Sequence, residues 1–136
     1  MDDPNDFGNI LLVEDNPGDV RWTKEMLKEA GLNPTVHVVT DGSEALDFIR
    51  QRGEYTDVPR PDVVLLDLHL PRMDGDEVLT RLGDEVSDIP IIALSGSQRI
   101  GAVKLEDMGD RVAARLEKPI EPDEVRDVVQ LVDDDD

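Results

Sequence analysis

The chain has 136 residues, the length of one domain, and it lacks cysteine, so disulfide bonds, thiolate metal ligands and thiol nucleophiles are excluded. Its 33 acidic residues outnumber 14 basic ones, and the formal charge of −19 disfavours binding to DNA, RNA or anionic lipid. No apolar run approaches the ~20 residues of a membrane span, and residues 1–6 lack the basic and then apolar order of a secretory signal, so we expect a cytoplasmic protein.

The acidic excess also predicts a protein from a salt-loving host. A charge of −19 repels itself and destabilises the compact state at low ionic strength. At molar salt the Debye length shrinks to about 3 Å, and that repulsion is largely screened. The alternative is an ordinary acidic protein that ends in an acidic tail.

Five short apolar runs alternate with amphipathic segments along the chain. The runs occupy residues 10–13, 36–39, 63–66, 91–94 and, least clearly, 112–116. The first, third and fourth are continuously apolar, which is typical of parallel strands covered on both faces.

The segments between these runs show helical periodicity. Successive helices are marked by Val20, Thr23, Leu27 and Ala30 before Gly31, by Ala45, Phe48 and Ile49, by Val78, Leu79 and Leu82 before Gly83, by residues 99–108, and by Val125, Val128, Val129 and Val132 after Pro122. Trp22 and Met26 flank the face of the first helix, and we expect both to be partly exposed.

The alternation of strands and helices predicts an α/β fold. We expect a doubly wound, five-stranded parallel sheet of order 2-1-3-4-5 with five helices, spanning residues 9–132. Residues 1–8 form an acidic lead, and residues 133–136 are predicted to be a disordered acidic tail.

Chemically capable side chains stand where the predicted strands end. Glu14 and Asp15 follow the first run, Asp67 the third, Ser95 the fourth and Lys118 the fifth. In an open parallel sheet, ligands bind beyond the carboxyl ends of the strands, where the strand order reverses. With the order 2-1-3-4-5, the three carboxylates would converge there.

Three carboxylates that crowd together need a cation, and hard oxygen ligands favour Mg²⁺. Lys118 could offset further negative charge, and Ser95 could hydrogen-bond a phosphoryl oxygen. A carboxylate oxygen of Asp67 could then attack a phosphoryl group. Taken singly, each residue also has a purely structural interpretation. Glu14 and Asp15 could simply interact favourably with the dipole at the N-terminus of the following helix, Ser95 could be a loop hydroxyl, and Lys118 could be a surface lysine.

Four blocks together resemble the receiver domains of two-component response regulators, with the flavodoxin-like receiver fold. They read VEDNPGD at 13–19, LDLHLPRMDG at 66–75, LSG at 94–96 and KPI at 118–120. The NPGD loop, with RGEY at 52–55 and PRP at 59–61, is similar to the phytochrome-associated single-domain branch. The resemblance runs from about residue 9 to residue 132.

This resemblance implies a role for each residue of the site. Asp67 would be the phosphoacceptor, and Asp15 would ligate Mg²⁺ directly. Glu14 would act on the metal mainly through water, and the backbone carbonyl of His69 would complete the protein ligands. Lys118 would be the phosphate partner.

Further implied features lie in the last two blocks. Ser95 would be the switch hydroxyl, where threonine is more frequent in the family, and the peptide bond between Lys118 and Pro119 would be cis. Arg115 is a departure, because receivers usually carry Tyr or Phe three residues before the lysine. The usual rotation of that aromatic ring on activation is therefore not expected here.

The resemblance further implies a regulatory phosphoacceptor that assists its own phosphorylation and dephosphorylation, not an enzyme. A sensor histidine kinase would supply the phosphoryl group. We expect output through contact with an effector protein, or transfer to a histidine phosphotransfer protein, from a monomer or weak homodimer.

Three alternatives remain open at this stage. An aspartyl-phosphate hydrolase would use the same nucleophile, but it needs a second aspartate where His69 stands. A flavodoxin-like cofactor binder would need a phosphate-binding loop rich in Ser, Thr or Gly. It would also need aromatic residues to hold the cofactor, and aromatic residues form only 3% of this chain. A docking module that works unphosphorylated is the third.

Overall fold

The computed structural model describes residues 8–32, 34–68, 70, 75–82, 89–96, 112, 114–118 and 120–134, with the backbone alone described at 75, 76, 95, 96 and 130–134. These residues form the elements β1 (Asn9–Val13), α1 (Pro17–Glu29), β2 (Thr35–Val39), α2 (Gly42–Arg50), a 3₁₀ helix (Gly53–Tyr55), β3 (Val63–Asp67), α3 (Gly75–Leu82), β4 (Ile91–Gly96), β5 (Ala114–Lys118) and α5 (Pro122–Asp134). The helix predicted at residues 99–108 lies outside the described residues.

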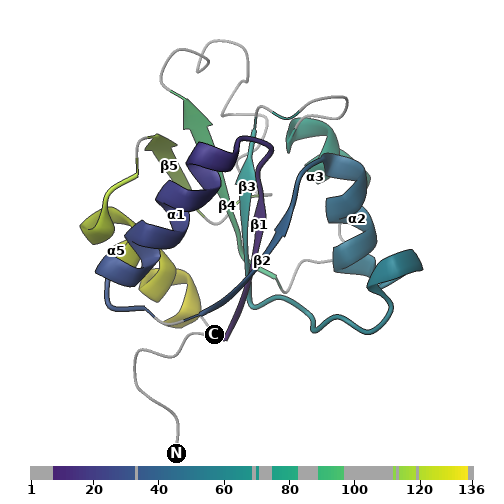
Figure 1. Cartoon of the computed structure of the whole chain (residues 1–136), viewed down its shortest axis with the longest axis horizontal. Coiled ribbons are helices and arrows are strands. Elements are labelled where there is room, and N and C mark those ends of the chain that lie inside the picture. The colour runs from purple at the N-terminus through teal and green to yellow at the C-terminus, as the bar shows by residue number, and fades with distance from the viewer. Residues whose placement is uncertain are drawn as a thin grey trace, which may run out of the picture.

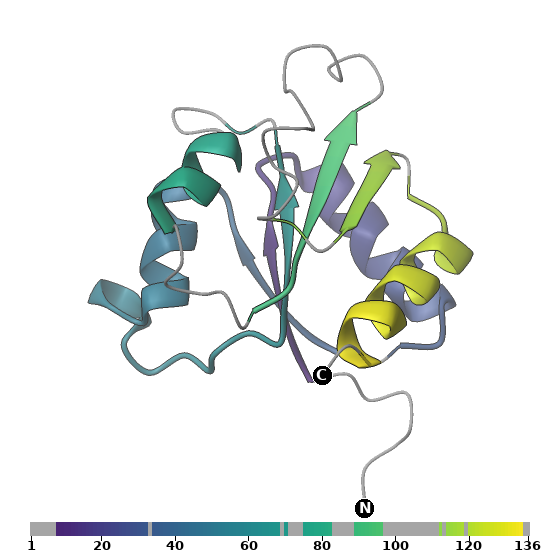
Figure 2. The same cartoon turned by 180° about the vertical axis from the view of Figure 1, so that it is seen from behind.

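The strands form one parallel sheet of order β2-β1-β3-β4-β5, which confirms the predicted topology. Helices α1 and α5 cover one face of the sheet, and α2 and α3 cover the other (Figures 1 and 2). In this order β1 and β3 are neighbours, although α1, β2 and α2 separate them in sequence. The carboxyl ends of β1 and β3 are therefore brought together at one edge of the molecule.

Two hydrophobic clusters lie on opposite faces of the sheet, and successive residues of β1 contribute to them in turn. Leu11 and Val13 pack in the cluster beneath α2 and α3, whereas Ile10 and Leu12 pack in the cluster beneath α1 and α5. All four are 0% exposed. Burial on both faces explains why the sequence of β1 is continuously apolar instead of alternating.

The helices begin and end where local chemistry favours it. The side chain of Asn16 caps α1 by accepting hydrogen bonds from the backbone N–H groups of Gly18 (2.8 Å) and Asp19 (3.1 Å). Gly31, predicted to stop this helix, follows the cap residue Ala30 with a φ of +82°, a conformation that favours glycine.

On the face of α1, one of the two exposure predictions was wrong. Trp22 is 45% exposed as expected, but Met26 is only 5% exposed. Met26 packs in the cluster beneath α1 and α5, because the apolar stripe of α1 is wider than the predicted positions.

Two boundaries differ from the prediction. Strand β5 begins at Ala114 instead of residue 112, since its extent is set by parallel pairing with β4, from Ile92↔Ala114 to Gly96↔Lys118. Helix α5 continues to Asp134, two residues into the predicted tail, and helix ends commonly extend or fray by this much.

No helix in the described part of the chain combines the length and the apolar character needed to cross a membrane.

Candidate metal centre

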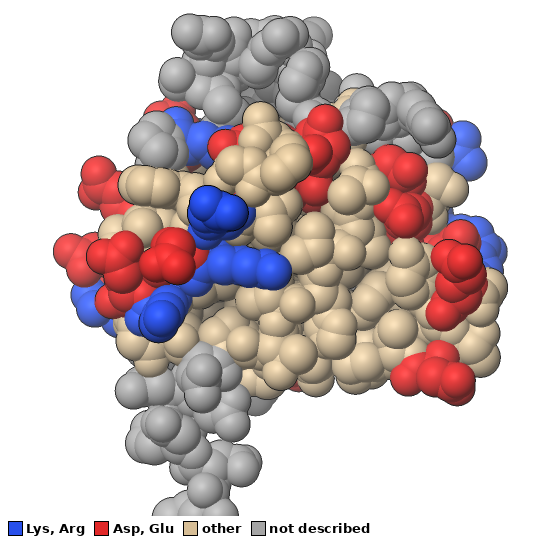
Figure 3. Space-filling view, in the orientation of Figure 1, with Lys and Arg blue, Asp and Glu red and all other residues tan. Residues whose placement is uncertain are grey.

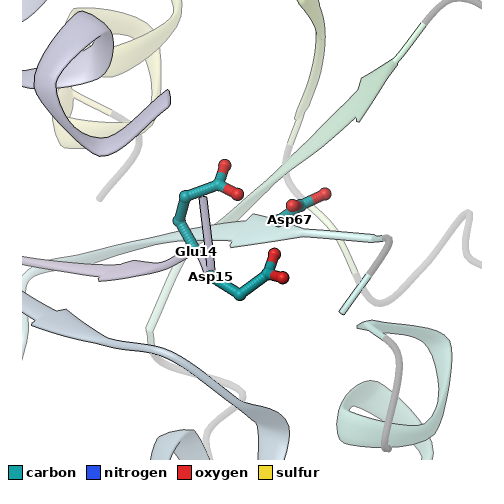
Figure 4. A group of neighbouring side chains, drawn as sticks. All are labelled: Glu14, Asp15 and Asp67. Atoms are coloured by element: carbon teal, nitrogen blue, oxygen red, sulfur yellow. The ribbon is translucent and has the colours of Figure 1, made fainter. Parts of the chain in front are cut away.

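The three predicted carboxylates do lie together at the carboxyl ends of β1 and β3. Glu14 and Asp15 directly follow β1, and Asp67 is the last residue of β3. Each side chain can offer one oxygen such that all three atoms lie within 4.8 Å of one another. Figure 4 shows the three side chains around a common space.

The local backbone holds these side chains in unequal environments. Glu14 is 1% exposed and Asp67 is 4% exposed, whereas Asp15 is exposed. The backbone N–H of Glu14 donates to the carbonyl of Val39 at 3.0 Å, so the pairing of β1 with β2 continues into the site. One oxygen of Glu14 also accepts a 3.3 Å hydrogen bond from the backbone N–H of Asn16.

Lys118, the last residue of β5, joins this cluster from the far side of β4. Its Nζ donates to Glu14 Oε1 at 2.5 Å, to Asp19 Oδ2 at 2.9 Å and to Asp67 Oδ2 at 3.3 Å. The Lys118 side chain is only 20% exposed. One ammonium group therefore serves three carboxylates, and negative charge remains in excess.

The pKa values of the two buried partners move in the same direction for different reasons. Burial raises the pKa of Glu14 to about 7, with a further contribution from the neighbouring Asp67 carboxylate, and Lys118 opposes both. Burial alone would lower the pKa of Lys118. Its hydrogen bonds to Glu14 and Asp19, together with the negative charge of Asp67, outweigh that effect and raise the pKa.

The donor set fits a hard divalent cation. Mg²⁺ prefers oxygen ligands and is held in proteins by one or two carboxylates, with the remaining positions left to water and phosphoryl oxygens. The site offers two buried carboxylates and one exposed carboxylate, and a single lysine cannot neutralise all three. A divalent cation would balance the remaining negative charge. Glu14, Asp15 and Asp67 would hold the metal.

Other predicted site features lie outside what the structure describes. His69 and Pro119 are not among the described residues, so neither the carbonyl ligand nor the cis peptide bond is tested. The backbone of Ser95 lies in β4, opposite Glu117 of β5, but its side chain is outside the description.

Sequence reasoning missed one residue of the site, Asp19. It stands in the first turn of α1, not at a strand end, so the rule that located the other carboxylates did not select it. Its place in the VEDNPGD block at 13–19, together with Glu14 and Asp15, was an available signal.

Residues 10–130 match the family described as the response regulator receiver domain. Response regulator Rcp1 of Synechocystis sp. is 40% identical over 98 residues, which cover 71% of this chain and 67% of Rcp1. Other curated relatives are longer, and the matched regions span 57% and 34% of two of them.

Solved structures give the same picture. The Mn²⁺-bound form of Rcp1 has a TM-score of 0.71 and 34% identity, covering 92% of this chain and 88% of that one. The phosphorylated cyanobacterial phytochrome response regulator RcpA has a TM-score of 0.68 and 34% identity, with the same coverage of 92% and 88%.

The bacteriophytochrome response regulator AtBRR has a TM-score of 0.78 and 37% identity, covering 90% of this chain and 89% of that one. Family match, strand order and the acidic cluster agree. The chain therefore belongs to the response regulator receiver domain family, whose members function in two-component phosphorelays.

Proposed function

We propose that Asp67 is the phosphoacceptor of this receiver and that phosphorylation requires Mg²⁺. The observation that supports this most directly is the meeting of Glu14, Asp15 and Asp67 within 4.8 Å, with Lys118 Nζ 3.3 Å from Asp67. Two relatives add support, since Rcp1 has been crystallised with Mn²⁺ and RcpA in a phosphorylated form. The backbone carbonyl of His69 would be a further metal ligand.

The reaction is a transfer between two nucleophiles. A carboxylate oxygen of Asp67 forms a bond to phosphorus while the bond from phosphorus to the donor's histidine nitrogen breaks, and the donor imidazole keeps that electron pair. When bound, Mg²⁺ would neutralise charge on the phosphoryl oxygens. Lys118 offsets negative charge beside Asp67 throughout, and the hydroxyl of Ser95 would hydrogen-bond a phosphoryl oxygen.

The same site would also allow the acyl phosphate to hydrolyse, so the chain assists both its phosphorylation and its dephosphorylation. It acts on its own aspartate and not on a separate substrate. The donor is a sensor histidine kinase, and the output is contact with an effector protein or transfer to a histidine phosphotransfer protein. Arg115 is exposed in β5 at the family's usual aromatic position, so output does not use rotation of an aromatic ring there.

Incubation with acetyl phosphate and Mg²⁺ in high salt, followed by intact mass spectrometry, tests this proposal. We expect one phosphoryl adduct on the parent protein, and none on Asp67→Asn or in EDTA. Asp127→Asn, which removes an exposed carboxylate on α5, is the matched control and should be phosphorylated like the parent. An adduct that persists in Asp67→Asn, or that forms equally in EDTA, would contradict the proposed role.

A further inference from the structure

Lys118 has no spare donor for a phosphoryl group. Its ammonium carries three N–H bonds, and it contacts three carboxylates, those of Glu14, Asp19 and Asp67. Asp67 is the most distant of them, at 3.3 Å, whereas Asp19 lies at 2.9 Å. Any phosphoryl oxygen that gains a full hydrogen bond from Lys118 must compete with these acceptors.

Among the three acceptors, Asp19 is the one that water can best satisfy. Its side chain is 43% exposed, compared with 1% for Glu14 and 5% for Asp67. Loss of the lysine contact would leave Glu14 as a buried carboxylate without its cation, which is strongly unfavourable. Asp19 would instead be hydrated, so Lys118 can exchange this partner most easily.

The backbone of Asp19 is anchored at the start of α1. Its N–H donates to Asn16 Oδ1 at 3.1 Å within the helix cap, so the short side chain can follow Lys118 only by rotation about its own bonds. A shift of the lysine toward Asp67 therefore lengthens the contact with Asp19. The contact with Asp19 and a hydrogen bond to a phosphoryl group on Asp67 therefore draw Lys118 in different directions.

We propose that Asp19 is a positioning residue that draws Lys118 away from the phosphoryl position and thereby weakens phosphoryl binding at Asp67. The inference rests on the proposed phosphoacceptor function. It assigns to α1 a direct part in setting how strongly the site retains its phosphoryl group. Removal of the Asp19 charge should strengthen that retention.

Titration with beryllofluoride, a phosphoryl mimic, in the presence of Mg²⁺ tests the inference by calorimetry and ¹⁹F NMR. We expect Asp19→Asn to bind beryllofluoride about two- to fivefold more tightly than the parent, the range typical of a partly exposed ion pair. The ¹⁹F resonances of the bound mimic should shift, because the ammonium of Lys118 lies closer to the fluorine atoms. Asp19→Glu, which keeps the charge, should return the affinity toward the parental value.

Glu25→Gln is the matched control, since it removes one exposed charge from α1 and Glu25 has no contact with Lys118 among the described residues. Equal or weaker binding by Asp19→Asn, or the same gain in Glu25→Gln, would overturn the inference. If the parent binds beryllofluoride and Asp19→Asn merely loses thermal stability, Asp19 is structural and the phosphoacceptor function stands. If the folded parent neither binds beryllofluoride nor accepts a phosphoryl group, both proposals fail.

Discussion

At the scale of single residues, Glu14 is a buried carboxylate with a strongly raised pKa. Its carboxylate is buried beside Asp67, and Lys118 only partly compensates, so its pKa lies near 7 instead of 4.5. A raised carboxylate pKa means that ionisation of Glu14 destabilises the folded state, and this effect grows as the pH rises from 4.5 toward 7. A bound divalent cation would neutralise the charge of the ionised Glu14 carboxylate and so offset this loss of stability.

Magnesium affinity should therefore depend on pH. At about pH 8 Glu14 is ionised in the metal-free protein, whereas at about pH 6 it holds a proton that the metal must displace. We expect the affinity to fall by up to about tenfold for each pH unit below 7. Calorimetric titration with Mg²⁺ across this range measures it. Glu14→Gln should bind Mg²⁺ more weakly than the parent, and its Mg²⁺ affinity should change little with pH over the same range. If the affinity of this variant fell with pH as steeply as that of the parent, the assignment to Glu14 would be contradicted.

Replacement of Lys118 should destabilise the fold through the carboxylates that it leaves behind. In Lys118→Met, two almost fully buried carboxylates would lose their cation, and we expect a loss of about 3 kcal/mol in the free energy of unfolding at about pH 8 without Mg²⁺. Protonation of Glu14 near pH 6, or added Mg²⁺, should reduce this loss.

Urea unfolding followed by circular dichroism measures the effect of Lys118→Met. Lys24→Met is the matched control, because Lys24 is exposed on α1 and, among the described residues, forms no ion pair like those of Lys118. Equal losses in the two variants would show that the overall charge of the chain, and not the site, is responsible.

The cluster of Glu14, Asp15, Asp67 and Lys118 could be predicted from sequence because the family resemblance supplies the strand order, and one rule then places the strand ends together. Glu14, Asp15, Asp67 and Lys118 all stand at carboxyl ends of strands, and parallel pairing brings such ends to one edge. Asp19 was not predicted, because its contact with Lys118 depends on how the start of α1 is placed relative to the end of β5. No strand pattern in the sequence encodes that placement. The perturbed pKa of Glu14 likewise depends on burial that the chain acquires only on folding.

At the scale of elements, predictions succeeded where a strand is buried on both faces. The apolar runs of β1, β3 and β4 match the observed strands within one or two residues. In β5, an edge strand, Leu116 is buried between exposed Arg115 and Glu117, so its boundaries depend on hydrogen bonding to β4 instead of hydrophobicity. Such a strand leaves only a weak sequence pattern.

The start of α1 gives an element-scale prediction. Asn16 accepts from two backbone N–H groups, and replacement by alanine would leave both without that acceptor. We expect Asn16→Ala to lower the free energy of unfolding by about 1 kcal/mol, measured by urea denaturation in EDTA. Asn16→Ser preserves an oxygen acceptor and should recover most of the loss. An undiminished stability in Asn16→Ala would mean that water replaces the cap without penalty.

At the scale of the whole molecule, the dominant feature is its charge of −19. In Figure 3, acidic side chains gather toward both sides of the displayed face, and most of the middle of this face carries neither acids nor bases. On this face the charged side chains, acidic and basic, therefore lie mainly to either side of an uncharged middle. The sequence alone predicts repulsion among the acids, but not which acids are paired with the few bases.

Screening of this repulsion should stabilise the protein. At about 0.1 M salt the Debye length is about 10 Å, enough for neighbouring helices to repel each other, and at molar salt it falls to about 3 Å. We expect the free energy of unfolding to rise by at least about 1 kcal/mol between about 0.1 M and about 2 M KCl, a rise of several degrees in Tm. The melting curves are recorded in EDTA, so that occupancy of the metal centre does not change with the salt.

A general effect of salt on hydrophobic burial is distinguished by a second comparison. A variant in which exposed helix acids are neutralised, such as Glu25→Gln combined with Glu29→Gln and Asp127→Asn, should be more stable than the parent in low salt and should gain less from added KCl. A parent protein with the same Tm at both salt concentrations would contradict the prediction of a salt-adapted protein. Equal gains in the parent and the neutralised variant would assign the effect to hydrophobic burial instead of charge screening.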